Sequence, residues 1–200
     1  PATSIARLYD HRDPIAEVIR RVVYETEVFK CVVEMERSNI AERSSKLFPF
    51  SGIYSASKYL INLEDKKKIE QIVTLVSSFW DNVGQQFDQW RGVRIGNISA
   101  TEVRRDYIHT HVVMLQALGI AGKDLIKANP TNWKAKLKNL KKIDWLKSNP
   151  IWDRRVLNNG RVVKNSNSII LASNVIKKAL GVSLNVNEKA LESKFKKNGK

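Results

Sequence analysis

Apolar residues recur every three or four positions in several segments of this 200-residue chain, and residues typical of helix ends bound those segments. This spacing places the apolar side chains on one face of an α-helix. Asp13-Pro14 begins the first segment, because aspartate caps a helix and proline fits the first turn. Gly181 ends a later segment, since glycine readily adopts the left-handed conformation that closes a helix. We therefore expect a mainly α fold, a compact domain of six to eight helices.

The predicted helix that begins at Ser99 has the most complete signature. Ser99 and Glu102 have the spacing of a capping box, in which each side chain satisfies an otherwise unpaired backbone N–H. Its expected buried stripe is Val103, Tyr107, Thr110 and Met114, and Gly119 is its expected end. The other helices are expected after Asp13-Pro14 and over 51–61, 62–83, 132–142, 168–180 and 187–195.

The expected β structure is small, at most a short strand pair or hairpin drawn from 27–36 and 155–164. Phe29, Cys31, Val33 and Met35 alternate with mostly polar neighbours, which predicts a short strand. Asn159-Gly160 lies between two apolar segments and is typical of a hairpin turn. Cys31 is the single cysteine, which excludes a disulfide within the chain and a zinc site built from several cysteines. Its apolar neighbours predict a buried thiol.

Positive charge is concentrated in the second half of the sequence. Residues 1–100 contain 14 Lys and Arg against 13 Asp and Glu, whereas residues 101–200 contain 21 against 7. A localised basic field is typical of a surface that binds a polyanion, most often nucleic acid. Charge alone also allows solvated side chains that aid solubility, or an anionic membrane surface. No apolar run has the length of a membrane span and no signal peptide is evident, so a cytoplasmic location is expected.

Basic residues form several candidate DNA contacts. The strongest is the lysine side of the helix over 132–142, because lysines neutralise phosphates and release counterions. The nearby Trp133, Trp145 and Trp152 are expected in the core rather than stacked on bases, and the lysines are otherwise simply solvated. A basic hairpin is a further candidate, and arginines mixed with small hydroxyl residues over 36–46 and at 104–105 suit either phosphate contact or internal pairing. The candidates are Lys134, Lys138, Lys141, Lys142, Arg154, Arg155, Arg161, Lys164, Arg37, Arg43, Lys46, Arg104 and Arg105.

Two polar clusters contain residue types that carry chemistry, and neither predicts an enzyme. Residues 9–13, Tyr-Asp-His-Arg-Asp, suit either phosphate binding or a charged helix cap. Asp106, His109 and His111 are metal-binding residue types, but helical ligands need a spacing of three or four, and two ligands do not hold a catalytic ion. The sequence also lacks a glycine-rich phosphate loop, a nucleophile elbow and the common metalloprotease motif. We expect no catalytic residue, no cofactor and no metal.

Several segments resemble the C-terminal half of the DndB family of DNA sulfur modification proteins, which belong to the DGQHR-domain proteins. They span most of the chain in order, with the least resemblance after Glu188. They are Leu8-Tyr9-Asp10-His11-Arg12-Asp13-Pro14, the run Glu36-Arg37-Ser38-Asn39-Ile40-Ala41-Glu42-Arg43-Ser44-Ser45-Lys46-Leu47-Phe48, then Arg104-Arg105-Asp106-Tyr107-Ile108-His109-Thr110-His111 with Gln116-Ala117-Leu118-Gly119, and Ile143-Asp144-Trp145 with Gly160-Arg161-Val162.

The resemblance implies a bacterial system that places phosphorothioates in the DNA backbone, and within it a DNA-binding regulator that represses the modification genes. The family's Asp-Gly-Gln-His-Arg motif is absent from these residues. The chain begins at Pro1 without a methionine, so we expect a segment of a longer protein. Two alternatives remain: an accessory part of a nucleotide-dependent DNA modification or restriction enzyme whose active site lies in an N-terminal half, and a protein-interaction module.

Double-stranded DNA is the expected partner, together with other DNA sulfur modification proteins or a second copy of the chain, and no membrane. Residues 1–130 are expected to form a helical core. Residues 131–200 are expected to form a basic helical and hairpin region that packs on this core as one unit.

Overall fold

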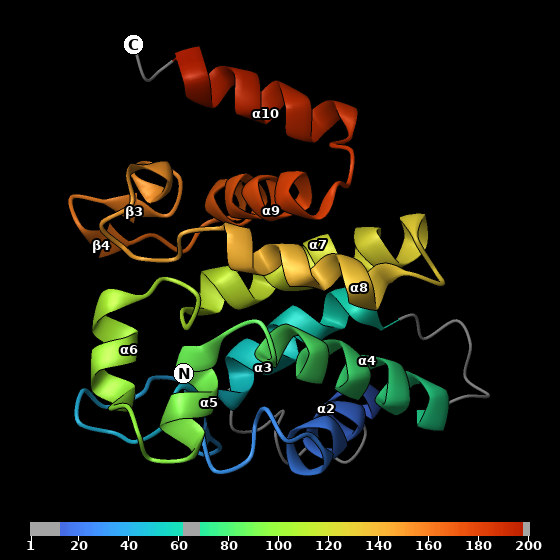
Figure 1. The fold of residues 1–200 in the computed structure, drawn as a ribbon, viewed down its shortest axis with the longest axis vertical. Helices are drawn as coiled ribbons and strands as arrows, with labels where there is room; N and C mark the ends of the chain where they lie inside the picture. Colours follow the sequence, from blue (N-terminus) through green and yellow to red (C-terminus); the bar gives the residue numbers. More distant parts are fainter. Residues whose placement is uncertain (1–12, 62–68, 198–200) are drawn as a thin grey trace.

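The computed structural model describes residues 13–61 and 69–197, and within these ranges the chain is mainly helical (Figure 1). The α-helices are α2 (Pro14–Glu25), α3 (Phe50–Ser57), α4 (Ile69–Gly84), α5 (Asp88–Arg94), α6 (Ala100–Asp106), α7 (Val112–Ala128), α8 (Trp133–Leu137), α9 (Ser166–Leu180) and α10 (Val186–Lys197). Short 3-10 helices are η1 (Lys58–Leu60), η2 (Lys138–Lys142) and η3 (Pro150–Trp152). The mainly α prediction is confirmed. The described residues form more helices than the six to eight expected, because α5 was not predicted and the helix predicted from Ser99 is divided in two.

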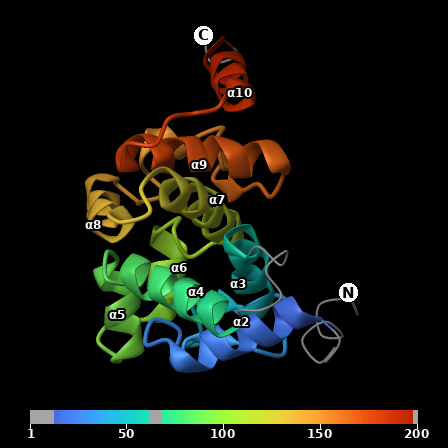
Figure 2. The same cartoon turned by 90° about the vertical axis from the view of Figure 1, so that its right-hand side faces the viewer.

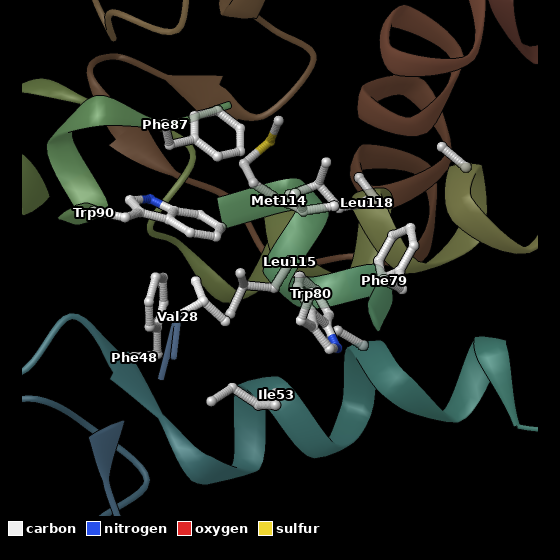
Figure 3. Close-up of a cluster of buried hydrophobic side chains, with 14 of the residues drawn as sticks. Val28, Phe48, Ile53, Phe79, Trp80, Phe87, Trp90, Met114, Leu115 and Leu118 are labelled. Carbon is white, nitrogen blue, oxygen red and sulfur yellow. The ribbon is translucent and has the colours of Figure 1, made fainter. Parts of the chain in front are cut away.

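The helices form a stack in which α7 is central. One side of α7 packs against α3 and the other against α9, and α10 packs on the outer side of α9 (Figures 1 and 2). Figure 3 shows Met114, Leu115 and Leu118 of α7 among aromatic rings, which come from Phe79 and Trp80 of α4 and from Trp90 of α5. The same buried cluster includes Trp133, Leu137 and Leu140, so α8 and η2 are anchored in the main core.

The predicted start of α2 is confirmed by its hydrogen bonds. Asp13 accepts bonds through Oδ1 from the backbone N–H groups of Ile15 at 2.9 Å and Ala16 at 3.3 Å. Its Oδ2 accepts a further bond of 2.6 Å from the hydroxyl of Tyr54 in α3. Asp13 therefore caps α2 and also ties it to α3. The preceding residues of the Tyr9–Asp13 cluster lie outside the described residues, as do the first residues of the helix predicted over 62–83.

The single helix predicted from Ser99 to Gly119 is wrong. Helix α6 ends at Asp106, and Tyr107 is extended and pairs with Leu146 in an isolated β-bridge. The backbone N–H of Ile108 then donates to the carbonyl of Trp145 at 2.9 Å, and a new helix begins at Val112. Hydrogen bonds to the segment around residues 145–147 thus replace those that would continue the helix. Gly119 lies inside α7 and does not end it.

The capping box predicted at Ser99 is also wrong, although the buried stripe is largely confirmed. Ser99 occupies the N-cap position of α6, but its side chain makes no capping hydrogen bond. Val103, Thr110 and Met114 are buried, and Tyr107 is partly buried and packs against the core.

The two segments expected to supply β structure do not pair with each other. Strand β1 (Val33–Glu34) pairs in parallel with β2 (Phe48–Pro49), in the register Val33 with Phe48. Strand β3 (Leu157–Asn158) pairs antiparallel with β4 (Arg161–Val162). Asn159 at φ 48° and Gly160 at φ 74° are both left-handed, as a tight type I′ hairpin turn requires, so the hairpin prediction is confirmed.

Cys31 corrects the prediction of a buried thiol. It has a φ of 62° in a turn before β1, and its side chain is exposed. The turn interrupts the alternation expected over 27–36, so that the strand itself covers only β1. Phe29 and Val33, on either side of Cys31, remain buried.

The helices predicted over 132–142, 168–180 and 187–195 are confirmed. Helix α8 continues directly into η2, and Trp133, Trp145 and Trp152 are buried, as expected for core tryptophans. Helix α9 ends at Gly181, whose φ of 72° supplies the predicted left-handed stop. No helix in 13–61 or 69–197 combines the length and apolar character needed to cross a bilayer.

Candidate nucleic-acid interface

The lysines of α8 and η2 form an outward surface, which we call the lysine face and define as Lys134, Lys138, Lys141 and Lys142. All four side chains are exposed. The opposite side of the same segment buries Trp133, Leu137 and Leu140, and this apolar anchor fixes which way the lysines point. Figure 2 shows α8 at the outer edge of the stack, beside α7. The sequence spacing and the buried side therefore produce one basic strip on a rigid segment.

The lysine face is free of ion pairs within the described residues, although Asp88 and Asp144 line the same pocket as Lys141. Within the part of the chain that the structure describes, none of its four lysines takes part in an ion pair, and Lys134 lies 5.5 Å from the ring centroid of Trp133. Four of the seven acidic residues in 101–200 are engaged elsewhere. They are Asp106, Asp124, Glu188 and Glu192. The positive field of this strip is thus directed to solvent.

The hairpin arginines and lysine do not act as one surface. Arg161 on β4 and Lys164 after it are exposed. Arg155 instead is buried and forms a two-pronged ion pair with Glu192 of α10, with distances of 2.9 and 2.6 Å. The guanidinium groups of Arg154 and Arg155 both lie over the ring of Phe195. The exposed residues Arg154, Arg161 and Lys164 therefore extend the outward basic surface, and the buried Arg155 does not.

The basic residues over 36–46 and at 104–105 form the third candidate group, and only some of them are free to contact DNA. Arg104 on α6 donates to the backbone carbonyls of Ser44 at 2.9 Å and Ala41 at 3.2 Å, and also to those of Glu42 and Lys46. It therefore clamps the loop that precedes β2, and both of its terminal nitrogens are already engaged. Arg105 pairs with Asp106 on the surface.

The remaining basic side chains of this loop are only partly engaged. Lys46 donates to the carbonyl of Cys31 at 2.9 Å. Arg37 and Arg43 are exposed, and among the described residues neither forms an ion pair.

The histidines beside α6 are structural groups. His109 is fully buried, and its Nδ1 accepts a hydrogen bond of 2.9 Å from the indole N–H of Trp90. Burial lowers the pKa of His109 to about 3. Burial, followed by the charge of Lys147, lowers the pKa of His111 to about 4. Both are neutral at pH 7, and in the described ranges no group of three or more suitable side chains could hold a metal ion.

Comparison with known families connects this surface to a biological context. The family model for DndB, described as DNA-sulfur modification-associated, matches residues 1–183. The chain belongs to the DndB family. Neither the curated proteins nor the solved structures contain a match to it.

Membership of the DndB family implies involvement in DNA sulfur modification. The matched region contains the lysine face, the hairpin and the loop clamped by Arg104, whereas α10 begins at Val186, after the match ends. The basic surfaces named above thus lie within the DndB-family region of the chain.

Other cations near these surfaces were not singled out from the sequence. Lys123 and Lys127 are exposed on α7, and their spacing of four residues is a signal that could have been used. Lys178 and Asn174 on α9 converge with Arg155 on Glu192. That grouping has no local sequence signal, because Arg155 and Glu192 are 37 positions apart.

Proposed function

We propose that this DndB-family chain is a DNA-binding regulatory part of a bacterial phosphorothioate modification system, and that it represses transcription of the modification genes. The observation that carries the proposal is the lysine face, a rigid strip of exposed lysines without acidic partners among the described residues. Each lysine that neutralises a DNA phosphate releases condensed counterions, and this release favours binding.

Exposed lysines on a helical segment suit phosphate contact better than base reading. A lysine ammonium is a compact point charge on a flexible stem, so it follows phosphates without selecting a base. Arg161 and Lys164 on the hairpin, with Arg37 and Arg43 on the loop, are secondary candidates because they are exposed. Residues that read the DNA sequence are then expected elsewhere on the same surface or in other parts of the protein.

The proposal gives the chain no catalytic role. His109 is buried and His111 partly buried, and both are neutral at pH 7 and bonded to structural partners. We propose that the chain acts on the modification genes by occupying their promoter DNA, with double-stranded DNA as its partner.

A salt titration of DNA affinity tests the proposal. The variant replaces Lys134, Lys138 and Lys141 with glutamine and is compared with the parent on promoter DNA of the modification genes. Loss of three phosphate contacts should lower the slope of log affinity against log salt by about 2.7. The matched control replaces Lys30, Lys58 and Arg91 with glutamine, which removes the same charge from the other half of the chain.

The two variants separate a local contact from a general charge effect. The lysine-face variant should lose both affinity and slope, and the control should keep both nearly intact. Equal losses in the two variants would mean that only net charge matters, and unchanged binding in both would place the DNA contact away from the lysine face. A promoter reporter then tests repression, which the lysine-face variant should relieve.

A further inference from the structure

Four nitrogen donors converge on one carboxylate where the hairpin, α9 and α10 meet. Arg155 donates to Glu192 Oε2 at 2.9 Å and Oε1 at 2.6 Å. Lys178 donates to Oε1 at 3.1 Å, and Asn174 Nδ2 donates to Oε2 at 3.2 Å. These donors form an anion-binding pocket, which we call the Arg155 pocket and define as Arg155, Asn174 and Lys178. The chain's own Glu192 occupies it.

The charge of Glu192 depends on these donors. Burial raises the pKa of Glu192, but hydrogen bonds and charge from Arg155 outweigh burial, with smaller help from Asn174 and Lys178, and the pKa is about 2. The carboxylate is therefore fully ionised at pH 7. A second α10 carboxylate, Glu188, pairs with the buried Lys177, which also pairs with Asp124.

Helix α10 is held by these ionic contacts far more than by apolar packing. Its only buried side chains are Glu188 and Glu192, while Leu191 and Phe195 are partly exposed. The remaining face carries the exposed lysines Lys189, Lys194, Lys196 and Lys197. Buried ion pairs contribute little net stability, because the cost of desolvating both charges offsets their attraction. The docking of α10 therefore depends on bonds that another anion can also make.

We propose that the Arg155 pocket binds a DNA backbone phosphate, and that α10 blocks this site with Glu192 until DNA displaces it. This inference rests on the proposed function, since it assigns a second phosphate contact to the same DNA-binding chain. Arginine presents paired N–H donors that fit two phosphate oxygens as well as two carboxylate oxygens, so a phosphate can make the same bonds. Helix α9 links the two surfaces, because η2, which carries part of the lysine face, packs against α9, and α10, which covers the pocket, packs on the outer side of α9 (Figure 1).

When DNA displaces α10, the released helix does not bring a net negative charge close to the DNA. The segment Val186–Lys197 contains four lysines and two glutamates, so it keeps a net positive charge when it leaves α9. Lys177 also keeps Asp124 as a partner after Glu188 departs. Exchange of α10 for DNA thus leaves no buried cation without an anion.

Hydrogen–deuterium exchange of the whole chain tests the displacement directly. Amides of residues 186–197 are compared without DNA and with a saturating duplex of the promoter sequence. We expect DNA to increase exchange in α10 while α9 stays protected. Unchanged or slower exchange in α10 at saturating DNA would overturn the inference and leave the proposed function standing.

Affinity measurements on a variant test the same inference if the unmodified chain binds DNA poorly. Glu188→Gln with Glu192→Gln removes the carboxylates that hold α10. DNA affinity should then rise by about fivefold or more, which is the lower end of the usual range of coupling between two binding events. Adding Arg155→Gln should cancel that gain, and Lys189→Gln with Lys194→Gln is the control on the exposed side of α10. Thermal unfolding checks that each variant folds.

The outcomes separate the two proposals. A gain that depends on Arg155 supports the pocket, even where the parent itself binds weakly. Binding by the parent with no gain in the glutamate variant would overturn the pocket alone, and no binding by either protein would overturn both proposals.

Discussion

Gly119 of α7 lies directly against the backbone carbonyl of Ala56 in α3. A Cβ atom at position 119 would be 2.2 Å from that oxygen and 3.0 Å from the carbonyl carbon. Real Cβ atoms do not approach backbone atoms so closely, so only glycine allows this crossing. The contact fixes the spacing of the two helices that carry much of the core, and it explains a glycine that the sequence placed at a helix end.

Gly119→Ala should destabilise the fold by at least about 2 kcal/mol. Alanine gains about 1 kcal/mol in helix propensity, but pushing two helix backbones apart costs more than that gain. Urea unfolding followed by tryptophan fluorescence measures the difference. Gly92→Ala in α5 is the control, because the atoms nearest to its new Cβ belong to the side chain of Ile98, which is 39% exposed, and not to backbone. A stable Gly119→Ala variant would show that the helix spacing is adjustable.

The two helix starts in the sequence that resemble caps should respond differently to mutation. Asp13→Ala should cost about 1 kcal/mol through the lost cap, with a further loss from its bond to Tyr54. Ser99→Ala should change the free energy of unfolding by less than about 0.5 kcal/mol, because the Ser99 side chain makes no capping bond. Equal effects in the same denaturation assay would contradict the capping geometry.

The helix from Ser99 shows what local sequence can and cannot predict. Apolar spacing identified Val103, Thr110 and Met114 as buried, because burial depends on a pattern that survives a break in the helix. The break itself was not predictable. It is made by backbone bonds between residues 106–108 and 145–147, and a window of neighbouring residues contains no record of such long-range partners. The cap at Asp13 and the turn at Asn159-Gly160, which depend on adjacent residues, were predicted correctly, whereas the capping box at Ser99 was not.

Protonation of His109 in the unfolded chain should lower the free energy of unfolding in mild acid. Its pKa is about 3 in the folded chain and about 6.5 when unfolded, so between these values the unfolded state binds the extra proton. Stability is therefore greatest above pH 6.5 and falls as the pH drops toward 3. From pH 7 to pH 5, His109 alone should cost about 2 kcal/mol.

His109→Gln isolates this contribution, because glutamine can still accept the bond from Trp90 without titrating. Its unfolding free energy should depend less steeply on pH than that of the parent. A parallel dependence in the two proteins would place the folded pKa of His109 near its ordinary value. His111, which burial also shifts, supplies a remaining pH dependence in both proteins.

Arg104 should matter for folding and Arg105 should not. Arg104 holds the carbonyls of Ala41 and Ser44, whereas Arg105 makes an exposed pair with Asp106. Arg104→Gln should cost at least about 2 kcal/mol and make the loop over 36–46 easier to cut with protease. Arg105→Gln should change stability by less than about 1 kcal/mol. Similar protease sensitivity in both variants would contradict the clamp.

The candidate DNA surface was only partly predictable, because partners that are distant in the sequence decide which cations are exposed. The lysine face follows from spacing, because Trp133, Leu137 and Leu140 must turn inward and thereby turn the lysines outward. Composition alone could not tell exposed cations from engaged ones. Arg155 has the same residue type and a similar sequence context to Arg161, yet it is buried against Glu192 while Arg161 is exposed.

The hairpin provides the last prediction, which asks whether it shares one DNA complex with the lysine face. Arg161→Gln with Lys164→Gln removes two exposed cations, and it should lower the salt slope by about 1.8 if both contact phosphates. Combined with the three lysine-face substitutions, the total loss of slope should approach about 4.5, because contacts to different phosphates of one duplex release counterions independently. The measurement is the same salt titration, with the lysine-face variant as the reference. A combined loss no larger than that of the lysine face alone would show that the hairpin faces away from the bound DNA.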